Sequence, residues 1–466
     1  MSTERLPLVS RRDLLRMTGA GFGMLGLAPL LAEQTPAASP LAPKPSHFAP
    51  KAKRIIHLFL NGAPSHVDSF DYKPKLAEYN GKPYPGGNLR TERKTGSLMQ
   101  SPFEFKPRGE SGIPISEIFP EVGSVIDHCC VINSMYTDVP FHEPSLFMFN
   151  CGQRLAGHPS MGAWLTYGLG TENQNLPGYV VLCPGYPVVG PQLWTSAYLP
   201  GAYQGAYVRN TERDPEKLVP FLKNPSTTPE QQKRQMALLE GLNEAHLERT
   251  GPAPELESQI HSMEVAYRMQ VEAMDAFDLR RESEATRADY GEGDFAAGCL
   301  LARRLVERGV RVVQVYYGNS QPWDTHDDIL RMRELAGDSD KPIGALIRDL
   351  HQRGLLDDTL VVIGGEFGRT PTVEVSGRIK VQAGRDHNSH GFTTIVAGGG
   401  IKPGLRYGAT DDFGFKAEVD RVHVHDLHTT LLHLLGLDHK RLTYRHSGRD
   451  FRLTDVHGEL VPGILA

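Results

Sequence analysis

Four segments of the sequence gather carboxylates and histidines, and each comes after a short apolar run. Imidazole nitrogens and carboxylate oxygens together suit a divalent cation such as zinc, manganese or calcium. We therefore predict a divalent metal ion as cofactor, and the identity of the metal stays open. The candidate ligands are His66, Asp68, Asp324, His326, Glu366, Asp386, His387 and His390.

A structural role is the alternative for the same residues. The acids would then form ion pairs with nearby arginines such as Arg369 and Arg385 and cap helices. A single histidine is more often a hydrogen-bonding residue than a ligand. The metal prediction therefore depends on the convergence of the four segments rather than on any one of them.

The apolar runs are the elements that must position these segments. Residues 54–60, 129–135, 310–317 and 359–363 are short and apolar, which predicts buried strands. The carboxyl ends of parallel strands meet at one edge of a sheet, where ligands bind in open α/β folds. Side chains expected in adjacent, buried parallel strands are Ile56, Leu58, Val313, Val315, Val361 and Ile363.

Helical patterns separate the strands. Two further strands are expected at 179–182 and 393–397, with helices at 116–127, 145–151, 161–169, 295–307, 342–355 and 424–437. Parallel strands need long crossover connections, which are almost always right-handed. The predicted fold class is therefore α/β, with a doubly wound, mostly parallel sheet that carries helices on both faces.

One region breaks this alternation. Residues 184–255 are rich in Pro, Tyr and Gln without a sustained period, and a long polar helix is expected at 255–288. We expect a cap-like insertion at about 184–290 within a single α/β domain of residues 51–466. His425, His428 and His433 in the last predicted helix lie among core leucines, which favours a structural role.

The first residues predict export. Ser10–Arg16 (SRRDLLR) is a twin-arginine pattern, and the glycine-rich stretch Met17–Leu31 is too short for a membrane span of about 20 residues. We expect a signal peptide at 1–32, a Pro/Ala linker at 33–50, and the twin-arginine translocation machinery as a partner. The mature protein would then be periplasmic or extracellular, without a transmembrane segment.

Composition excludes some functional classes. The 50 Lys and Arg against 55 Asp and Glu give a formal net charge of −5, without the basic excess of nucleic-acid-binding proteins. Five cysteines are too sparse for a disulfide framework and lack CxxC spacing for a metal. Such a set is typical of a protein that folds in the reducing cytoplasm before export.

Several motifs together resemble one known family. They are Gly62–Asp71 (GAPSHVDSFD), Leu301–His326, Gly364–Pro371 (GGEFGRTP), Gly384–Thr393 (GRDHNSHGFT) and the tail Asp426–Val461. On these motifs the chain resembles the bacterial exported family called domain of unknown function 1501. That family is similar to the alkaline-phosphatase/sulfatase superfamily, so the resemblance implies a doubly wound α/β fold with a metal site at the strand ends.

The chain departs from this superfamily where sulfatase chemistry is carried. In place of a Cys-x-Pro-Ser-Arg nucleophile motif it has HEPSL, which puts His142 at the nucleophile position. In place of an Asp-His pair it has Glu366-Phe367, and its first strand ends in Asn61-Gly62 without an acidic ligand. A formylglycine sulfatase mechanism is therefore disfavoured.

Two functions from different classes fit these residues. The preferred one is an exported metal-dependent hydrolase of sulfate or phosphate esters, including sulfated polysaccharides, in which Arg369 or Arg385 grips the anion. Metal-bound water or His142 would attack. The alternative is a non-catalytic exported binding or assembly protein that keeps the fold, and the missing nucleophile supports it. Turnover of an aryl sulfate or phosphate favours the first function, and metal retention without turnover favours the second.

Overall fold

The structure is a computed structural model that describes residues 40–87, 89, 91–218, 228–251, 274–375 and 383–466. The predicted signal peptide and the first part of the predicted linker lie outside the described residues. Among the residues that are described, no helix is long and apolar enough to cross a membrane.

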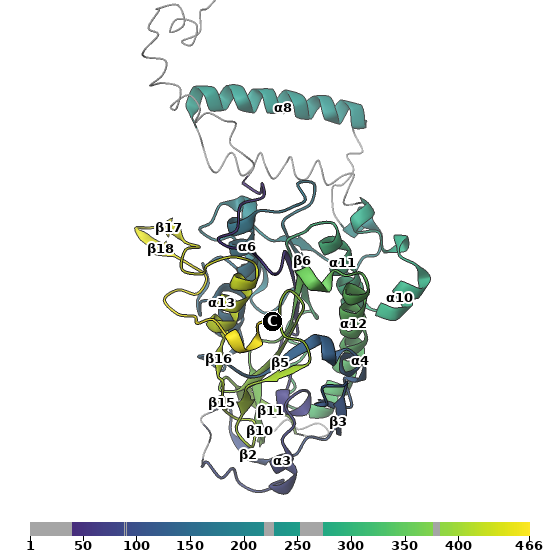
Figure 1. The fold of residues 1–466 in the computed structure, drawn as a ribbon, viewed down its shortest axis with the longest axis vertical. Helices are drawn as coiled ribbons and strands as arrows, with labels where there is room; N and C mark the ends of the chain where they lie inside the picture. The colour runs from purple at the N-terminus through teal and green to yellow at the C-terminus, as the bar shows by residue number, and fades with distance from the viewer. Residues whose placement is uncertain (1–39, 88, 90, 219–227, 252–273, 376–382) are drawn as a thin grey trace, which may run out of the picture.

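A nine-stranded sheet forms the centre of the molecule (Figure 1). Its strands in order are β13 (Leu405–Tyr407), β5 (Cys129–Tyr136), β12 (Phe392–Ala397), β9 (Thr359–Gly364), β1 (Arg54–Phe59), β8 (Val312–Tyr316), β6 (Tyr179–Leu182) and β7 (Ala206–Val208), and β16 (Val422–His423) pairs with β5. All pairings are parallel except those of β12, which runs antiparallel between β5 and β9. The predicted mostly parallel α/β sheet is confirmed.

The central strands pair in the register that buries one set of side chains together. Ile56 pairs with Val313 on one side and Val361 on the other, and Leu58 pairs in the same way with Val315 and Ile363. All six side chains are buried in one cluster. Because side chains alternate between the two faces of a strand, the residues between them face the opposite layer. The predicted adjacency of these strands is confirmed.

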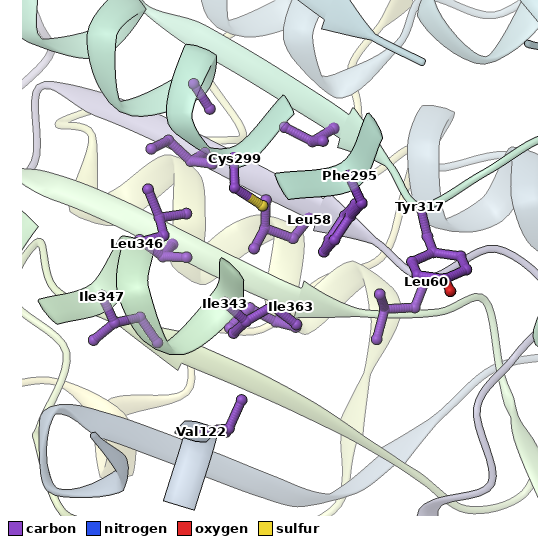
Figure 2. Packing of buried hydrophobic residues seen from close by; sticks show 14 of the residues in the cluster. Leu58, Leu60, Val122, Phe295, Cys299, Tyr317, Ile343, Leu346, Ile347 and Ile363 are labelled. Atoms are coloured by element: carbon purple, nitrogen blue, oxygen red, sulfur yellow. The ribbon is translucent and has the colours of Figure 1, made fainter. Parts of the chain in front are cut away.

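Helices cover both faces of the sheet, as a doubly wound fold requires. On one face lie α4 (Pro120–Ser124), α11 (Asp294–Glu307) and α12 (Met332–Gln352). Figure 2 shows Leu58 and Ile363 beneath Phe295 and Cys299 of α11 and Leu346 of α12. The other face carries α5 (His142–Cys151), α6 (Met161–Leu169) and α13 (Val424–Leu434), which pack in a second cluster. The two layers keep water from the strand backbones and leave the strand ends for function.

Further elements lie outside the central sheet. The described part of the chain also contains the helices α3 (Pro74–Glu78), α7 (Pro215–Leu218), α8 (Pro229–Thr250) and α10 (Glu284–Tyr290). A three-stranded sheet contains β11 (Arg385–Asn388), β10 (Gly368–Glu374) and β2 (Thr95–Leu98). Two-stranded sheets pair β3 (Phe105–Arg108) with β4 (Ile113–Ser116), β14 (Ala409–Thr410) with β15 (Ala417–Val419), and β17 (Tyr444–His446) with β18 (Arg449–Phe451).

Proline changes two of the predicted helices. The helix predicted at 116–127 is wrong over its first turn: Ser116 ends β4, and α4 begins at Pro120. Proline fits the first turn of a helix because its missing N–H is not needed there. In α12 the reverse occurs, since the helix begins at Met332 and contains Pro342 in its interior. Its apolar stripe continues on both sides of the proline, and burial of that stripe outweighs the lost hydrogen bond.

The region without a sustained sequence period contains a long helix. α8 spans 22 residues within the stretch 184–255. Its sequence is rich in Glu, Gln, Lys, Arg, Ala and Leu, which favour a helix even without a narrow apolar stripe.

The predicted helix at 255–288 also needs correction. Residues 252–273 lie outside the described part of the chain. Of the rest, residues 274–276 are helical, and the chain then breaks before a short turn at Leu279–Arg281 and α10. The side chains of Asp278 and Ser283 accept hydrogen bonds from backbone N–H groups two and three residues later. Such caps start new helical turns and interrupt a continuous helix.

Candidate metal centre

The topology of the sheet brings distant loops to one edge. Because β1, β5, β8 and β9 point the same way, the loops that follow them share the edge formed by their carboxyl ends. β12 is antiparallel and therefore begins at this edge. The segment before it, which includes β11, thus joins the same loops.

Four side chains from these loops converge, and we call them the histidine–aspartate cluster: His142, Asp324, His326 and His387. One ligand atom of each lies within 4.8 Å of all the others. Oδ1 of Asp324 lies 2.8 Å from Nε2 of His326 and 3.3 Å from Nε2 of both His142 and His387. Neighbouring ligand atoms of a tetrahedral zinc ion with bonds of about 2.0–2.1 Å are about 3.3 Å apart. The spacing therefore fits one ion of this size.

A carboxylate faces the second ring nitrogen of each histidine. The pairs are His142 Nδ1 with Glu366 Oε1 (2.6 Å), His387 Nδ1 with Glu92 Oε2 (2.7 Å), and His326 Nδ1 with Glu374 Oε2. An imidazole whose Nδ1–H donates to a carboxylate presents the lone pair of Nε2 to a metal, and metal-binding histidines usually have such a partner. The repetition of this arrangement three times points to a metal centre.

One buried atom tests whether a metal fits. Nε2 of His142 is buried and makes no hydrogen bond of regular geometry within the described residues, and its nearest ionic partner is Oδ1 of Asp324 at 3.3 Å. A buried polar atom whose hydrogen bonding is incomplete is unfavourable. A dication at the centre of the cluster would satisfy this nitrogen, so the residues present fit the ion.

The electrostatics of the cluster favour the protonation states that a metal needs. Burial opposes ionisation of Asp324, but Arg369, whose Nη2 lies 2.6 Å from Oδ1, and the three histidines hold the pKa of Asp324 well below its usual range. Burial lowers the pKa of His387 to about 3, so this imidazole is neutral at neutral pH. An ionised carboxylate and a neutral imidazole are the forms that bind metals.

His142 behaves differently from His387. Burial opposes its protonation, but the carboxylates of Asp324 and Glu366 outweigh burial and raise the pKa of His142 above its ordinary value. A metal ion must therefore displace a proton from His142 more often than from His387.

Two glycines allow the loops to approach this closely. Gly62 has a φ of +107°, and a Cβ at this position would lie 2.6 Å from the backbone nitrogen of Asp324. A Cβ at Gly384 would collide with the carbonyl oxygen of Thr325. A larger residue at either position would push the loop that carries Asp324 and His326 away from the cluster.

Two predicted ligands lie next to the cluster rather than in it. Glu366 supports His142 and accepts a hydrogen bond from the backbone nitrogen of Gly62 at 3.1 Å. Asp386 accepts hydrogen bonds from the backbone nitrogens of His387 (2.8 Å) and Arg93 (2.7 Å). Both carboxylates orient the segments that carry ligand histidines.

Three other predicted ligands have partners elsewhere. Asp68 is fully buried and pairs with Arg385, with 2.6 Å between Oδ2 and Nε. Nε2 of His66 lies 2.7 Å from the carbonyl oxygen of Gly414, and His390 is exposed at the surface. The structure thus brings Asp324, His326 and His387 of the eight predicted ligands together, and His142, expected at the nucleophile position, joins them as a fourth. Asp386 belongs to two further groups of possible ligands, one with Glu92 and His387 and one with His326 and Glu374.

The two arginines predicted to grip an anion are engaged within the protein. Arg369 is fully buried and binds Asp324 and the carbonyl oxygen of Ala63. Arg385 is fully buried and binds Asp68 through two nitrogens. Their guanidinium groups therefore hold the loops of this edge together.

Sequence reasoning missed Glu92, Arg93 and Glu374. Glu92 and Arg93 belong to a charged segment without periodicity, and nothing local relates them to His387. Glu374 ends β10, and only the inward direction of that side chain reveals its role. Arg93 is 44% exposed, and its Nη1 lies 3.1 Å from Oε1 of Glu374. It is therefore a solvent-accessible cation beside the cluster.

Fold and site together define an α/β protein with a candidate metal centre at the carboxyl edge of a mostly parallel sheet. Residues 52–465 match the sequence model of a family described as protein of unknown function (DUF1501). The chain belongs to this family, and the resemblance inferred from its motifs is confirmed.

Solved structures with a similar fold include three from bacteria. The lipoteichoic acid synthase LtaP from Listeria monocytogenes is 12% identical, with 91% of this chain and 79% of that chain covered and a TM-score of 0.37. The PsFucS1 sulfatase from Pseudoalteromonas sp. is 12% identical, with coverages of 83% and 68% and a TM-score of 0.35. The alkaline phosphatase from the Antarctic bacterium TAB5 is 11% identical, with coverages of 83% and 98% and a TM-score of 0.35. A comparison with curated proteins found no match.

Proposed function

We propose that this protein is a metal-dependent hydrolase of sulfate or phosphate esters. The observation that carries the proposal is the histidine–aspartate cluster, in which three imidazoles with carboxylate partners and one aspartate present four ligand atoms to one point. A bound dication would supply Lewis-acid chemistry, since it stabilises negative charge on an ester oxygen and activates water.

The chain supplies access for an anionic substrate on one side of the cluster. The side chain of Asp324 is 20% exposed, whereas that of His387 is 3% exposed, so solvent reaches the cluster past Asp324. Arg93 lies beside this opening and takes the role first expected of Arg369 and Arg385. Its guanidinium can form charge-assisted hydrogen bonds with sulfate or phosphate oxygens.

Water is the attacking group in this proposal. Nε2 of His142 points into the cluster, which makes the histidine a ligand rather than a nucleophile. In the described part of the chain, the hydrogen-bond and ion-pair partners of the cluster are imidazoles, carboxylates, arginine and backbone groups. A hydroxyl or thiol nucleophile is therefore not assigned.

Elemental analysis of the purified mature protein, followed by hydrolysis assays on aryl phosphates and aryl sulfates, tests the proposal. We expect about one divalent ion per chain and turnover that is lost on chelation and restored by the same metal. Arg93→Ala should raise KM for the anionic ester without removing the metal, and Arg154→Ala is the matched surface control. Fully metal-loaded protein without turnover of either ester class would argue against the hydrolase.

One observation favours a second function. Four protein side chains already offer one ligand atom each, and closed four-ligand sites are typical of structural metals, whereas catalytic zinc keeps one position open. A non-catalytic exported binding or assembly protein fits that geometry. Metal that is retained, stabilises the fold and supports no hydrolysis would establish this alternative.

The proposal includes export through the twin-arginine route to the periplasm or beyond, which Ser10–Arg16 supports. The five cysteines are buried free thiols, which fits folding in a reducing compartment before translocation. Replacing Arg11 and Arg12 by Lys should leave the precursor in the cytoplasm, as cell fractionation would show. Normal periplasmic accumulation of this variant would contradict the export route.

A further inference from the structure

A cleft of about 520 Å³ opens to solvent and is lined by residues from around Tyr84, His390 and Phe415. The side chains that matter for its chemistry are Tyr84, His390, Phe413, Phe415, Lys416 and Glu418. Volumes of this size are typical of sites for small organic ligands.

Two separate segments connect the cleft with the cluster. His390 lies three residues after His387, and Leu89, which also lines the cleft, lies three residues before Glu92. Three residues span at most about 11 Å. In addition, Nδ2 of Asn388 donates a hydrogen bond to the carbonyl oxygen of Phe415 at 2.8 Å. The cleft wall is therefore fixed to the segment that carries a ligand of the cluster.

Half-buried aromatic rings form the wall. The ring of Tyr84 meets those of Phe413 and Phe415 edge to face, with centroids 5.5 and 5.9 Å apart, and the ring of Phe415 lies 5.2 Å from that of His390. A Cβ at Gly86 would collide with the ring of Tyr84, so glycine at this position keeps that ring in place. The wall thus offers ordered apolar faces to a ligand.

The polar groups of the cleft divide into two kinds. The carboxylate of Asp411 accepts hydrogen bonds from three backbone N–H groups of its own loop, and Asp412 pairs with Lys75. In contrast, Lys416, Glu418 and His390 are exposed at the cleft, and none of these side chains forms an ion pair within the described residues. Lys416 is positive and Glu418 negative, the carboxylate of Asp411 adds a second negative charge to the lining, and the three exposed groups include donors and acceptors.

We propose that the cleft binds a sugar ring, the alcohol part of an ester whose anionic group lies at the histidine–aspartate cluster. The inference rests on the proposed function and names its substrate class as sulfated or phosphorylated carbohydrates. Aromatic faces pack against the C–H face of a pyranose, and the donors and acceptors at the rim hydrogen-bond its hydroxyls. A second anion would need a net positive cleft, whereas the carboxylates of Asp411 and Glu418 outnumber the ammonium of Lys416 in this one.

Binding can be measured apart from turnover. The test uses the mature, metal-loaded protein, with galactose 6-sulfate and glucose 6-phosphate as probes and saturation-transfer NMR and calorimetry as readouts. Tyr84→Ala and Phe415→Ala should each weaken binding of the sugar esters 10-fold or more. Phe105→Ala is the matched control, because this residue stacks on Tyr72 and does not line the cleft. Metal content and thermal unfolding confirm that each variant is folded.

A milder variant guards against misfolding. Glu418 is exposed, so Glu418→Gln should fold normally and weaken binding of the sugar esters about three-fold or more while binding of a short alkyl sulfate or phosphate stays unchanged. Sugar esters that bind no better than alkyl esters would overturn the inference, whether or not alkyl esters are hydrolysed. A stronger effect of Tyr84→Ala on aryl esters than on sugar esters would overturn it in favour of an aryl alcohol. Sugar binding that is lost in the cleft variants, in a protein without hydrolase activity, would support the cleft and reject the hydrolase.

Discussion

His387 and His428 are both buried, and burial lowers the pKa of each to about 3, yet their surroundings differ. In the histidine–aspartate cluster, which contains His387, a carboxylate faces the second nitrogen of every imidazole. On α13, Nε2 of His425 and His428 lies 2.8 Å from the carbonyl oxygens of Gly152 and Phe149, and the Nδ1 atoms have no hydrogen-bond partner in the described residues.

The comparison shows that burial and histidine content do not make a metal centre. Both groups are imidazoles buried in the core, but only the histidine–aspartate cluster surrounds its rings with carboxylates and brings one nitrogen of each ring to a common point. The α13 imidazoles instead join a helix to the end of α5. Their contacts agree with the structural role that the surrounding leucines predict.

The largest contrast is expected between His326→Ala and His428→Ala. The first should remove the metal, because no other side chain can replace Nε2 of His326 at that point. The His428→Ala variant should keep about one ion per chain, although loss of the buried ring should lower its free energy of unfolding by about 3 kcal/mol. Elemental analysis together with denaturant unfolding measures both effects. Equal metal content in the two variants would remove the distinction between the two groups.

The buried pair of Asp68 and Arg385 should matter for stability alone. Both side chains are fully buried, and Asp68→Asn would leave the guanidinium without its counter-charge. We expect a loss of about 3–5 kcal/mol in the free energy of unfolding, while the remaining folded protein keeps its metal. Urea unfolding and elemental analysis check this prediction. Loss of metal without loss of stability would return Asp68 to the ligand set.

Asp340 extends the comparison to carboxylates. Unlike Asp324, which pairs with Arg369, it accepts hydrogen bonds only from the backbone nitrogens of Glu121 and Val122, both at 2.8 Å. Burial raises the pKa of Asp340 to about 6 from an ordinary value of 3.8, although these hydrogen bonds act in the opposite direction. The folded protein therefore holds this proton more tightly than the unfolded chain does.

The pH dependence follows from that difference. The contribution of Asp340 to stability is fully present below about pH 4 and is lost as the pH rises through about 6. Relative to Asp340→Asn, the wild-type protein should lose up to about 3 kcal/mol between pH 4 and pH 7. Urea unfolding of both proteins at several pH values measures this, and parallel curves would contradict it.

The smallest expected effect tests the carboxylates themselves. Glu374→Gln should weaken metal binding about 10–100-fold, because His326 loses the charge that orients its ring and raises its basicity. Glu78 is exposed, so Glu78→Gln is a control with the same chemical change and no expected effect. Competition with a chelator gives the two dissociation constants. Identical dissociation constants would show that the carboxylate partners do not account for the difference in metal binding between this cluster and the histidines of α13.

Local sequence patterns determined the sheet and the segments that carry the chemistry. Short apolar runs such as the one from Thr359 to Ile363 bury both faces of a strand, and this property depends only on neighbouring residues. Parallel strands place their carboxyl ends at one edge, which is why the segments that hold Asp324, His326 and His387 were predicted to meet. Helix ends were predicted less well. Pro342 lies inside a helix instead of starting one, and the side chains of Asp278 and Ser283 cap new helical turns within a stretch that reads as one continuous helix.

Only the tertiary structure decided which atoms reach the centre. Asp68 and His66 have the same chemistry as the ligands, but Asp68 pairs with Arg385, which lies 317 residues away in the sequence. Glu92 and Glu374 also reach the second nitrogens of His387 and His326 through contacts between separate segments, and the second of these contacts spans 48 residues. A sequence pattern specifies which segments meet at a sheet edge, because strands that alternate with helices along the chain run parallel and end at the same edge. It does not specify side-chain direction to within the few ångströms that a metal bond requires, because packing of the whole fold sets that direction.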